Sequence, residues 1–195
     1  MAWATQGAAV GEKTIVLVCP AGHRATLAAQ TILAHYPATN VQVLQHGLVG
    51  WDNIAAVSPD FMVVLGLGDS SEKLSLSLAA CAAATEMHST VVLVLMSDGV
   101  NWFLKADSPK LSTVQEKLPE CANVETVSHG EPFKPCKAML SKFLSSGGII
   151  LACTTCIKSR NYDFKTDLMD CIHPMQMPDL VRMMGDAKGG CLQFM

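Results

Sequence analysis

The sequence is poor in charged and aromatic residues, which make up only 16% and 6% of its 195 residues. Its formal net charge is −3, and its lysines and arginines are scattered along the chain without forming a basic block. Because a nucleic-acid backbone is bound through a concentrated positive field, we expect no nucleic-acid partner. Half of the residues are hydrophobic, which excludes disorder as the main state.

Long apolar runs are also missing. The most apolar stretch, residues 89–96, has the length of a β-strand, whereas a membrane-spanning helix needs about 20 apolar residues. The N-terminus, MAWATQGAAVGEK, has no basic segment followed by a sustained apolar core, so it lacks the pattern of a secretory signal. We therefore expect a cytoplasmic protein without a membrane span, in which residues 1–12 are a flexible N-terminus.

Cysteine, by contrast, is frequent, with eight residues. Small secreted domains use many cysteines to compensate for a poor core, but this chain has enough apolar sequence to build a large one. We expect most thiols to be reduced and buried as small hydrophobic residues. Four of them stand in no loop that could activate a thiol and are predicted to have no chemical role: Cys81, Cys121, Cys136 and Cys191.

The first part of the chain has the pattern of a strand–helix–strand unit. Residues 14–18 form a β-branched run that is apolar on both faces, which predicts a buried strand. A helix is predicted over residues 24–35, where Tyr36-Pro37 ends it, and a second strand over residues 41–44. This pattern predicts a βαβ unit over residues 13–57.

The loop between that strand and helix, CPAGHRA, holds a cysteine in a setting that can activate it. A cysteine is nucleophilic as the thiolate, which backbone N–H groups, a helix N-terminus and a nearby cation stabilise. Gly22 permits a tight curl of the loop, and Arg24 is close enough to bind an oxyanion, with His23 between them. The loop therefore predicts a nucleophile, Cys19, with an anion-binding set formed by Gly22, His23 and Arg24.

Loop, helix, strand and turn follow one another here in an order that resembles the second half of a rhodanese sulfurtransferase domain. The shared motifs are Cys-x-x-Gly-x-Arg in CPAGHRA and Gly-x-x-Gly-Trp in VQVLQHGLVGW, which places Gly47, Gly50 and Trp51. The resemblance covers about residues 13–57, and the first half of such a domain has no counterpart in this sequence. It implies that Cys19 takes part in sulfur transfer.

From residue 60 onward, apolar strands alternate with helices. The predicted strands are residues 61–67, 89–96, 149–152 and 191–194, and the predicted helices are residues 72–87, 100–104, 134–144 and 177–184. Residues 106–132 contain three prolines and interrupt this alternation. We expect them to form a long, partly ordered segment with a strand-like piece at residues 123–127, and such a segment suits subunit contacts. The alternation predicts an α/β fold with a mostly parallel sheet between helices, a three-layer αβα arrangement.

The ends of the predicted strands are where ligands and chemistry gather in such sheets. The strand IILAC runs directly into CTTC, which contains Cys153 and Cys156, whereas Asp98 after an earlier strand is explained as a turn residue. A CxxC pair can resolve a persulfide, exchange disulfides, or supply two metal ligands, with Cys171 and His173 as the nearest additional ligands. Because a single CxxC is a poor metal signature, we expect neither a metal nor another cofactor.

About residues 60–195 resemble the DsrE/DsrF-like sulfur-relay proteins. The resemblance rests on FMVVLGLGDSSEKLSLSLAACAAATEMHSTVVLVLMSDGVNWFLK, on MLSKFLSSGGIILACTTCIKSR and on the terminal GGCLQF. It implies that Cys153 carries sulfur as a persulfide, and Cys156 is a departure from the commoner family pattern. It also implies a homo-oligomer, a trimer or a hexamer.

The sequence therefore favours a sulfur-trafficking protein that carries or transfers sulfane sulfur as a persulfide on Cys19, Cys153 or both. As a sulfurtransferase it would take thiosulfate or small persulfides as donors and a thiol-bearing protein as acceptor. Two alternatives stay open: a non-catalytic, oligomeric assembly module, and a thiol–disulfide oxidoreductase that uses Cys153 and Cys156.

Overall fold

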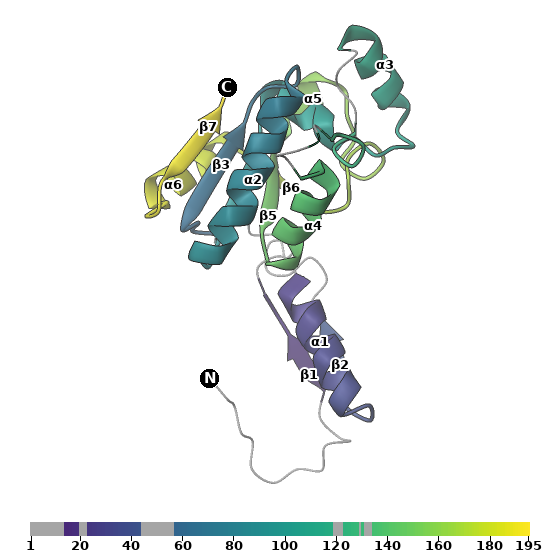
Figure 1. Ribbon diagram of the computed structural model, residues 1–195, viewed down its shortest axis with the longest axis vertical. Helices are drawn as coiled ribbons and strands as arrows, with labels where there is room; N and C mark the ends of the chain where they lie inside the picture. Colours follow the sequence, from purple (N-terminus) through teal and green to yellow (C-terminus); the bar gives the residue numbers. More distant parts are fainter. Residues whose placement is uncertain (1–13, 20–22, 44–56, 119–122, 129, 131–133) are drawn as a thin grey trace.

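The computed structural model describes residues 14–19, 23–43, 57–118, 123–128, 130 and 134–195. The described residues form a large α/β unit and, at one end of it, a small unit from the N-terminal part of the chain (Figure 1). No helix among these residues combines the length and the apolar character needed to cross a membrane.

The large unit is built on a sheet of five strands, all of them parallel. The strands are β3 (Phe61–Leu65), β4 (Val91–Leu95), β5 (Ile149–Cys153), β6 (Ile172–Met175) and β7 (Cys191–Phe194), in the spatial order β6-β5-β4-β3-β7. The register pairs Leu65 with Leu95, and Leu95 with Ala152. The carboxyl ends of the three central strands therefore meet at one edge of the sheet.

Helices cover both faces of this sheet, as the alternating sequence pattern predicts. Helices α2 (Ser71–Met87) and α4 (Cys136–Ser145) pack on one face, and α6 (Met177–Asp186) packs on the other (Figure 1). Each face has its own apolar core, with Leu78 and Phe143 in the first and Leu180 in the second. The α/β class and the flanked parallel sheet are confirmed.

Local signals explain where the principal helix begins. The side chain of Ser70 accepts a hydrogen bond from the backbone N–H of Lys73, the arrangement of an N-terminal cap. Glu72 follows in the first turn, where a negative charge stabilises the helix. The next strand, β4, is buried at all five positions, which accounts for its continuous apolar sequence.

The structure differs from the predictions around residues 100–132. The helix predicted at 100–104 is a 3₁₀ helix, η2 (Ser97–Phe103), and the predicted excursion contains a regular helix, α3 (Pro109–Lys117). The strand predicted at 123–127 is wrong, because these residues form a turn in which the side-chain oxygen of Asn123 accepts a hydrogen bond from the N–H of Glu125.

The small unit consists of β1 (Ile15–Leu17), α1 (His23–His35) and β2 (Val41–Val43), with the two strands parallel. The βαβ pattern is confirmed, but the prediction that the first strand is buried is wrong. Val16 is 57% exposed, and Ile15 and Val18 are exposed as well. Among the described residues, two strands and one helix make up this unit, which is too little structure to bury both faces of its sheet.

Candidate functional site

Two cysteines lie together at the carboxyl edge of the large sheet. Cys153 is the last residue of β5 and the N-cap of the short helix α5 (Thr154–Ser159), whose first turn contains Cys156. Neither forms a disulfide. Cys153 is only 1% exposed, whereas Cys156 is partly exposed. We call these two residues the thiol pair.

The two thiols lie close together at the start of α5. Cys153 occupies the N-cap position and Cys156 the third helical position, and side chains at these two positions approach each other at a helix start. A hydrogen bond with the Cys153 side chain is among the interactions that raise the pKa of Cys156. The thiol pair therefore combines a buried sulfur with a more accessible one directly beside it.

The neighbouring strand supplies a hydrogen-bond donor to the accessible thiol. The backbone N–H of Ser97, two residues beyond β4, donates to the sulfur of Cys156 across 3.2 Å. Ser97 has a φ of +43°, in the left-handed region that few residues other than glycine adopt. Such unfavourable backbone geometry persists where the surrounding structure enforces it, and it is frequent at functional sites.

An ion pair stands next to the thiol pair. Nη2 of Arg160 lies 2.6 Å from Oδ1 of Asp98, and Nη1 of Arg160 donates to the backbone carbonyl of Cys156 at 3.1 Å. The same Oδ1 of Asp98 accepts a hydrogen bond from the side chain of Asn101, which in turn accepts one from the Tyr162 hydroxyl. A cation is thus fixed at the end of α5.

Opposing influences act on the ionisation of Cys156. Burial has the largest effect and raises the pKa of this thiol, and the contact with Cys153 acts in the same direction. The Ser97 amide and the positive charge of Arg160 lower the pKa, but the net result lies above the ordinary value. At neutral pH Cys156 is therefore mainly a thiol, although its surroundings favour an anion through one amide and one cation.

Close packing of the strand ends holds this site in shape. A Cβ atom on Gly99 would lie 2.2 Å from the carbonyl oxygen of Leu65, and one on Gly68 would lie 2.6 Å from the Cβ of Asp98. Only glycine fits such distances. The end of β4 is therefore pressed against the end of β3, which fixes Ser97 and Asp98 beside the thiol pair.

The other predicted nucleophile, Cys19, belongs to the small unit. The backbone N–H of Ala25, in the first turn of α1, donates to the sulfur of Cys19 at 3.4 Å. This is one donor of the kind expected for the loop. Several other predicted residues lie outside the described part of the chain: Gly22, Gly47, Gly50, Trp51 and the side chain of His23.

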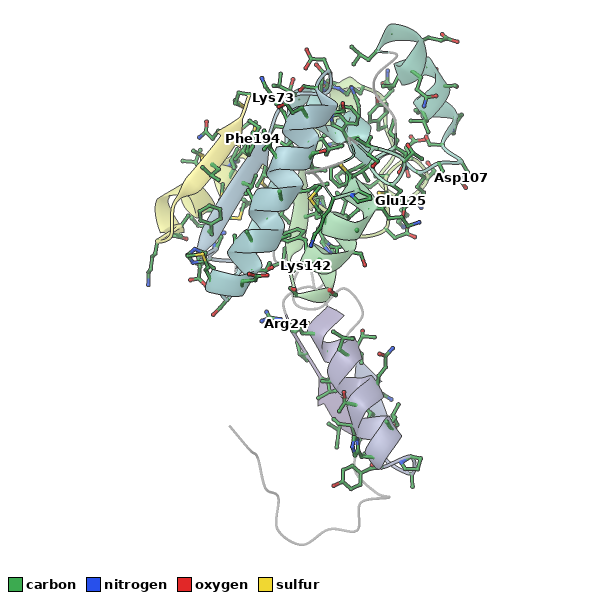
Figure 2. The ribbon with its side chains drawn as sticks, in the orientation of Figure 1. Arg24, Lys73, Asp107, Glu125, Lys142 and Phe194 are labelled. Atoms are coloured by element: carbon green, nitrogen blue, oxygen red, sulfur yellow. The ribbon has the colours of Figure 1, made fainter. Side chains whose placement is uncertain are left out.

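The structure does not bring Cys19 and the thiol pair together. Arg24, which follows the Cys19 loop, lies against Gly147: a Cβ atom there would be 2.4 Å from Nε of Arg24. Gly147 precedes β5, whereas Cys153 ends it, so the two sites are at opposite ends of this strand. Figure 2 shows Arg24 where α1 meets the lower end of α4, and Figure 1 shows α5 at the upper end of the sheet. Five strand residues alone span roughly 13 Å.

The remaining cysteines are placed differently. Cys81 and Cys136 are buried, and Cys136 shares a hydrogen bond with Ser75. Burial also raises the pKa of Cys171 to about 11. Among the described residues, no group of three or more histidine, cysteine or acidic side chains is arranged to hold a metal ion, and His173 pairs in register with Leu151, not with Cys153.

Three residues of the site were missed by the sequence analysis. Asp98 was explained as a turn residue, and Ser97 and Arg160 were given no role. The available signal was the position of SDG directly after the most apolar strand, because strand ends are where sites form. Their convergence on Cys156 depends on residues about sixty positions apart, which spacing alone does not reveal.

Comparisons with known proteins agree with one of the two resemblances. A model of the DsrE/DsrF-like family matches residues 61–189. The YchN protein of E. coli, known from a crystal structure, is similar to the chain with 22% sequence identity and a TM-score of 0.49, over 70% of this chain and 99% of YchN. No curated protein matches the chain. The rhodanese resemblance at residues 13–57 lies outside the family match and has no support from these comparisons.

Proposed function

The chain belongs to the DsrE/DsrF-like family, and we propose that it relays sulfur as a cysteine persulfide formed at the thiol pair. Membership of this family implies a sulfur-relay role. The persulfide chemistry is our proposal. The observation that supports it most directly is the 3.2 Å hydrogen bond from the Ser97 amide to the sulfur of Cys156.

The proposed reaction is attack by a thiolate of the pair on the outer sulfur of thiosulfate or of a small persulfide. Sulfite or a small thiolate leaves, and the protein retains Cys–S–S⁻. A persulfide is a stronger acid than a thiol, so it is the loaded form that carries a negative charge. The Ser97 amide and the guanidinium of Arg160 lie beside the position of this charge.

Cys19 is a second candidate site for the same chemistry. The amide of Ala25 donates to its sulfur, and Arg24 follows in the first turn of α1. We propose that Cys19 accepts sulfane sulfur independently of the thiol pair, as expected from its resemblance to the rhodanese loop. A sulfurtransferase activity of the chain would then have two separate acceptors.

We propose further that the chain acts as a homo-oligomer, a trimer or a hexamer, with residues 13–57 and 60–195 as its two domains. Proteins of this family often form oligomers. The natural partners would be small sulfur donors and a protein that presents an acceptor thiol.

Sulfur loading is tested by intact-protein mass spectrometry after brief exposure to thiosulfate or glutathione persulfide. The variants are Cys19→Ser, Cys153→Ser and Cys156→Ser, with Cys191→Ser as a control thiol on β7, away from both sites. We expect the wild type and the control to gain sulfur that a reductant removes during this brief exposure, and Cys156→Ser to diminish this gain. If no protein gains sulfur, the carrier proposal fails and the assembly-module alternative is supported.

A further inference from the structure

We propose that the two sulfurs of the thiol pair have ordered roles: Cys156 accepts the sulfane sulfur, and Cys153 then displaces it as sulfide while a Cys153–Cys156 disulfide forms. The site would thus reduce sulfane sulfur to sulfide in addition to carrying it. This inference rests on the proposed function in one respect, because sulfur must first reach the thiol pair.

Accessibility assigns the first role. Cys156 is partly exposed, whereas Cys153 is 1% exposed and packs in the apolar core between β5 and α6, close to Met175 and Leu180. A charged donor such as thiosulfate cannot reach a sulfur in that core without losing its hydration. The accessible thiol is also the one that accepts a hydrogen bond from the Ser97 amide.

Contact between the thiols assigns the second role. Cys153 caps the helix whose first turn carries Cys156, and the Cys153 side chain is close enough to raise the pKa of Cys156. A resolving thiol has to reach the inner sulfur of the persulfide, and the N-cap and third helical positions hold these two side chains on the same turn. Among the described residues, Cys153 is the one cysteine that contributes to the pKa shift of Cys156.

The chemistry balances without an external oxidant. In the first step the Cys156 thiolate attacks the outer sulfur of thiosulfate, the S–S bond of thiosulfate breaks, and sulfite leaves. In the second step the Cys153 thiolate attacks Sγ of Cys156, the persulfide S–S bond breaks, and the outer sulfur leaves as HS⁻. The two thiols are oxidised to a disulfide and the sulfane sulfur is reduced to sulfide. A further turnover requires a dithiol reductant, such as a thioredoxin-type protein.

Burial favours release over storage. The negative charge of a persulfide on Cys156 is stabilised by one amide and by Arg160, but Asp98 already binds Arg160 at 2.6 Å. The loaded state is therefore only partly compensated for the loss of water around it. Expulsion of HS⁻ returns this charge to solvent and leaves a neutral disulfide in the half-buried site.

The experiment uses the reduced, full-length chain with thiosulfate as the donor and no added thiol, so that any sulfide comes from the protein. Released sulfide is measured by its conversion to a fluorescent bimane derivative, and the disulfide by peptide mapping. We expect the wild type and the control Cys191→Ser to release about one sulfide per chain and to form the Cys153–Cys156 disulfide. Cys153→Ala should retain one added sulfur on Cys156 and release sulfide only at background level, and Cys156→Ser should neither retain sulfur at the pair nor release it.

The outcomes separate this inference from the proposed function. If Cys156→Ser is loaded on Cys153, or if the wild type keeps its sulfur without forming a disulfide, the ordered roles are wrong although sulfur is still carried. If no variant gains sulfur at either cysteine, the carrier proposal itself fails. Because Cys153→Ala leaves a small gap in the core, Cys153→Ser and a circular dichroism spectrum of each variant separate a folding defect from a loss of the resolving thiol.

Discussion

Arg160 and Asp98 form an ion pair, 2.6 Å between Nη2 and Oδ1, that joins the end of α5 to the residues that follow β4. Both partners lie beside Cys156. Arg160 donates a hydrogen bond to the carbonyl oxygen of Cys156, and Asp98 follows Ser97, whose amide donates to the sulfur of Cys156. The pair links the two strand ends that make up the site, and it places one charge of each sign near the accessible thiol.

Removal of the cation should make Cys156 less reactive. The positive charge of Arg160 lowers the pKa of this thiol, so Arg160→Gln should raise the pKa further and slow alkylation by iodoacetamide near neutral pH by roughly twofold to fivefold. The rate is measured at Cys156 by peptide mass spectrometry over a range of pH. Lys158→Gln, a change at an exposed residue of the same helix, should leave the pH dependence of the alkylation rate unchanged. An unchanged profile for Arg160→Gln would show that the cation does not act on the thiol.

Removal of the anion should act in the opposite direction. Asp98→Asn leaves the charge of Arg160 without its partner, so the field at Cys156 becomes more positive and its pKa should fall. Because Asp98 is half exposed, we expect alkylation to accelerate by no more than about threefold. The same pH profile provides the measurement. A slower reaction than in the wild type would mean that Asp98 is needed mainly to hold Arg160 in place.

Gly99 should tolerate no side chain. A Cβ atom there would lie 2.2 Å from the carbonyl oxygen of Leu65, which is backbone inside the sheet and has no room to move. We expect Gly99→Ala to lower the free energy of unfolding by about 2 kcal/mol or more and to reduce sulfur loading at the thiol pair. Gly185→Ala on α6 is the matched control, because nothing lies within 4 Å of its added methyl group. Thermal unfolding compares the two, and equal melting temperatures would contradict the packing argument.

Stability should decrease at alkaline pH because of buried thiols. Burial raises the pKa of Cys171 from 9.0 to about 11, so the folded chain keeps this proton at pH values where the unfolded chain has lost it. The resulting stabilisation is complete below about pH 9 and is lost as the pH rises to about 11, with at most about 2–3 kcal/mol at stake. Cys171→Ser should make the decrease smaller in urea unfolding at several pH values. Equal decreases in both proteins would show that other groups cause it.

The two proposed sulfur sites of one chain should load independently. Arg24 packs against Gly147 before β5, whereas the thiol pair lies at the other end of this strand. Cys19→Ser should therefore leave the rate of sulfur uptake by Cys156 unchanged, as followed by peptide mass spectrometry after exposure to thiosulfate. Slower uptake in this variant would indicate transfer from Cys19 of another copy in an oligomer.

Much of the large unit follows from the sequence because its signals are local. The run VVLVL is buried at every position of β4, and the capping serine and alanine-rich sequence of α2 determine where that helix begins and how it packs. The helix α3 was missed because Pro109 was interpreted as a break, although proline is favoured in the first turn of a helix. The strand β6 was missed for a related reason: Pro174 argues against a strand, but β6 is at the edge of the sheet, where proline is tolerated.

The sequence by itself determined the alternation of strands and helices, the sulfur-relay family and the thiol pair after an apolar strand. Only the tertiary structure decided which sulfur of the pair is accessible and which residues surround it. Ser97 and Arg160 reach Cys156 because parallel pairing aligns the carboxyl ends of β4 and β5, and that register joins residues far apart in the chain. The tertiary structure likewise separates Cys19 from the thiol pair. Each site follows a strand, but the two strands belong to different sheets, and the small unit packs at the opposite edge of the large unit.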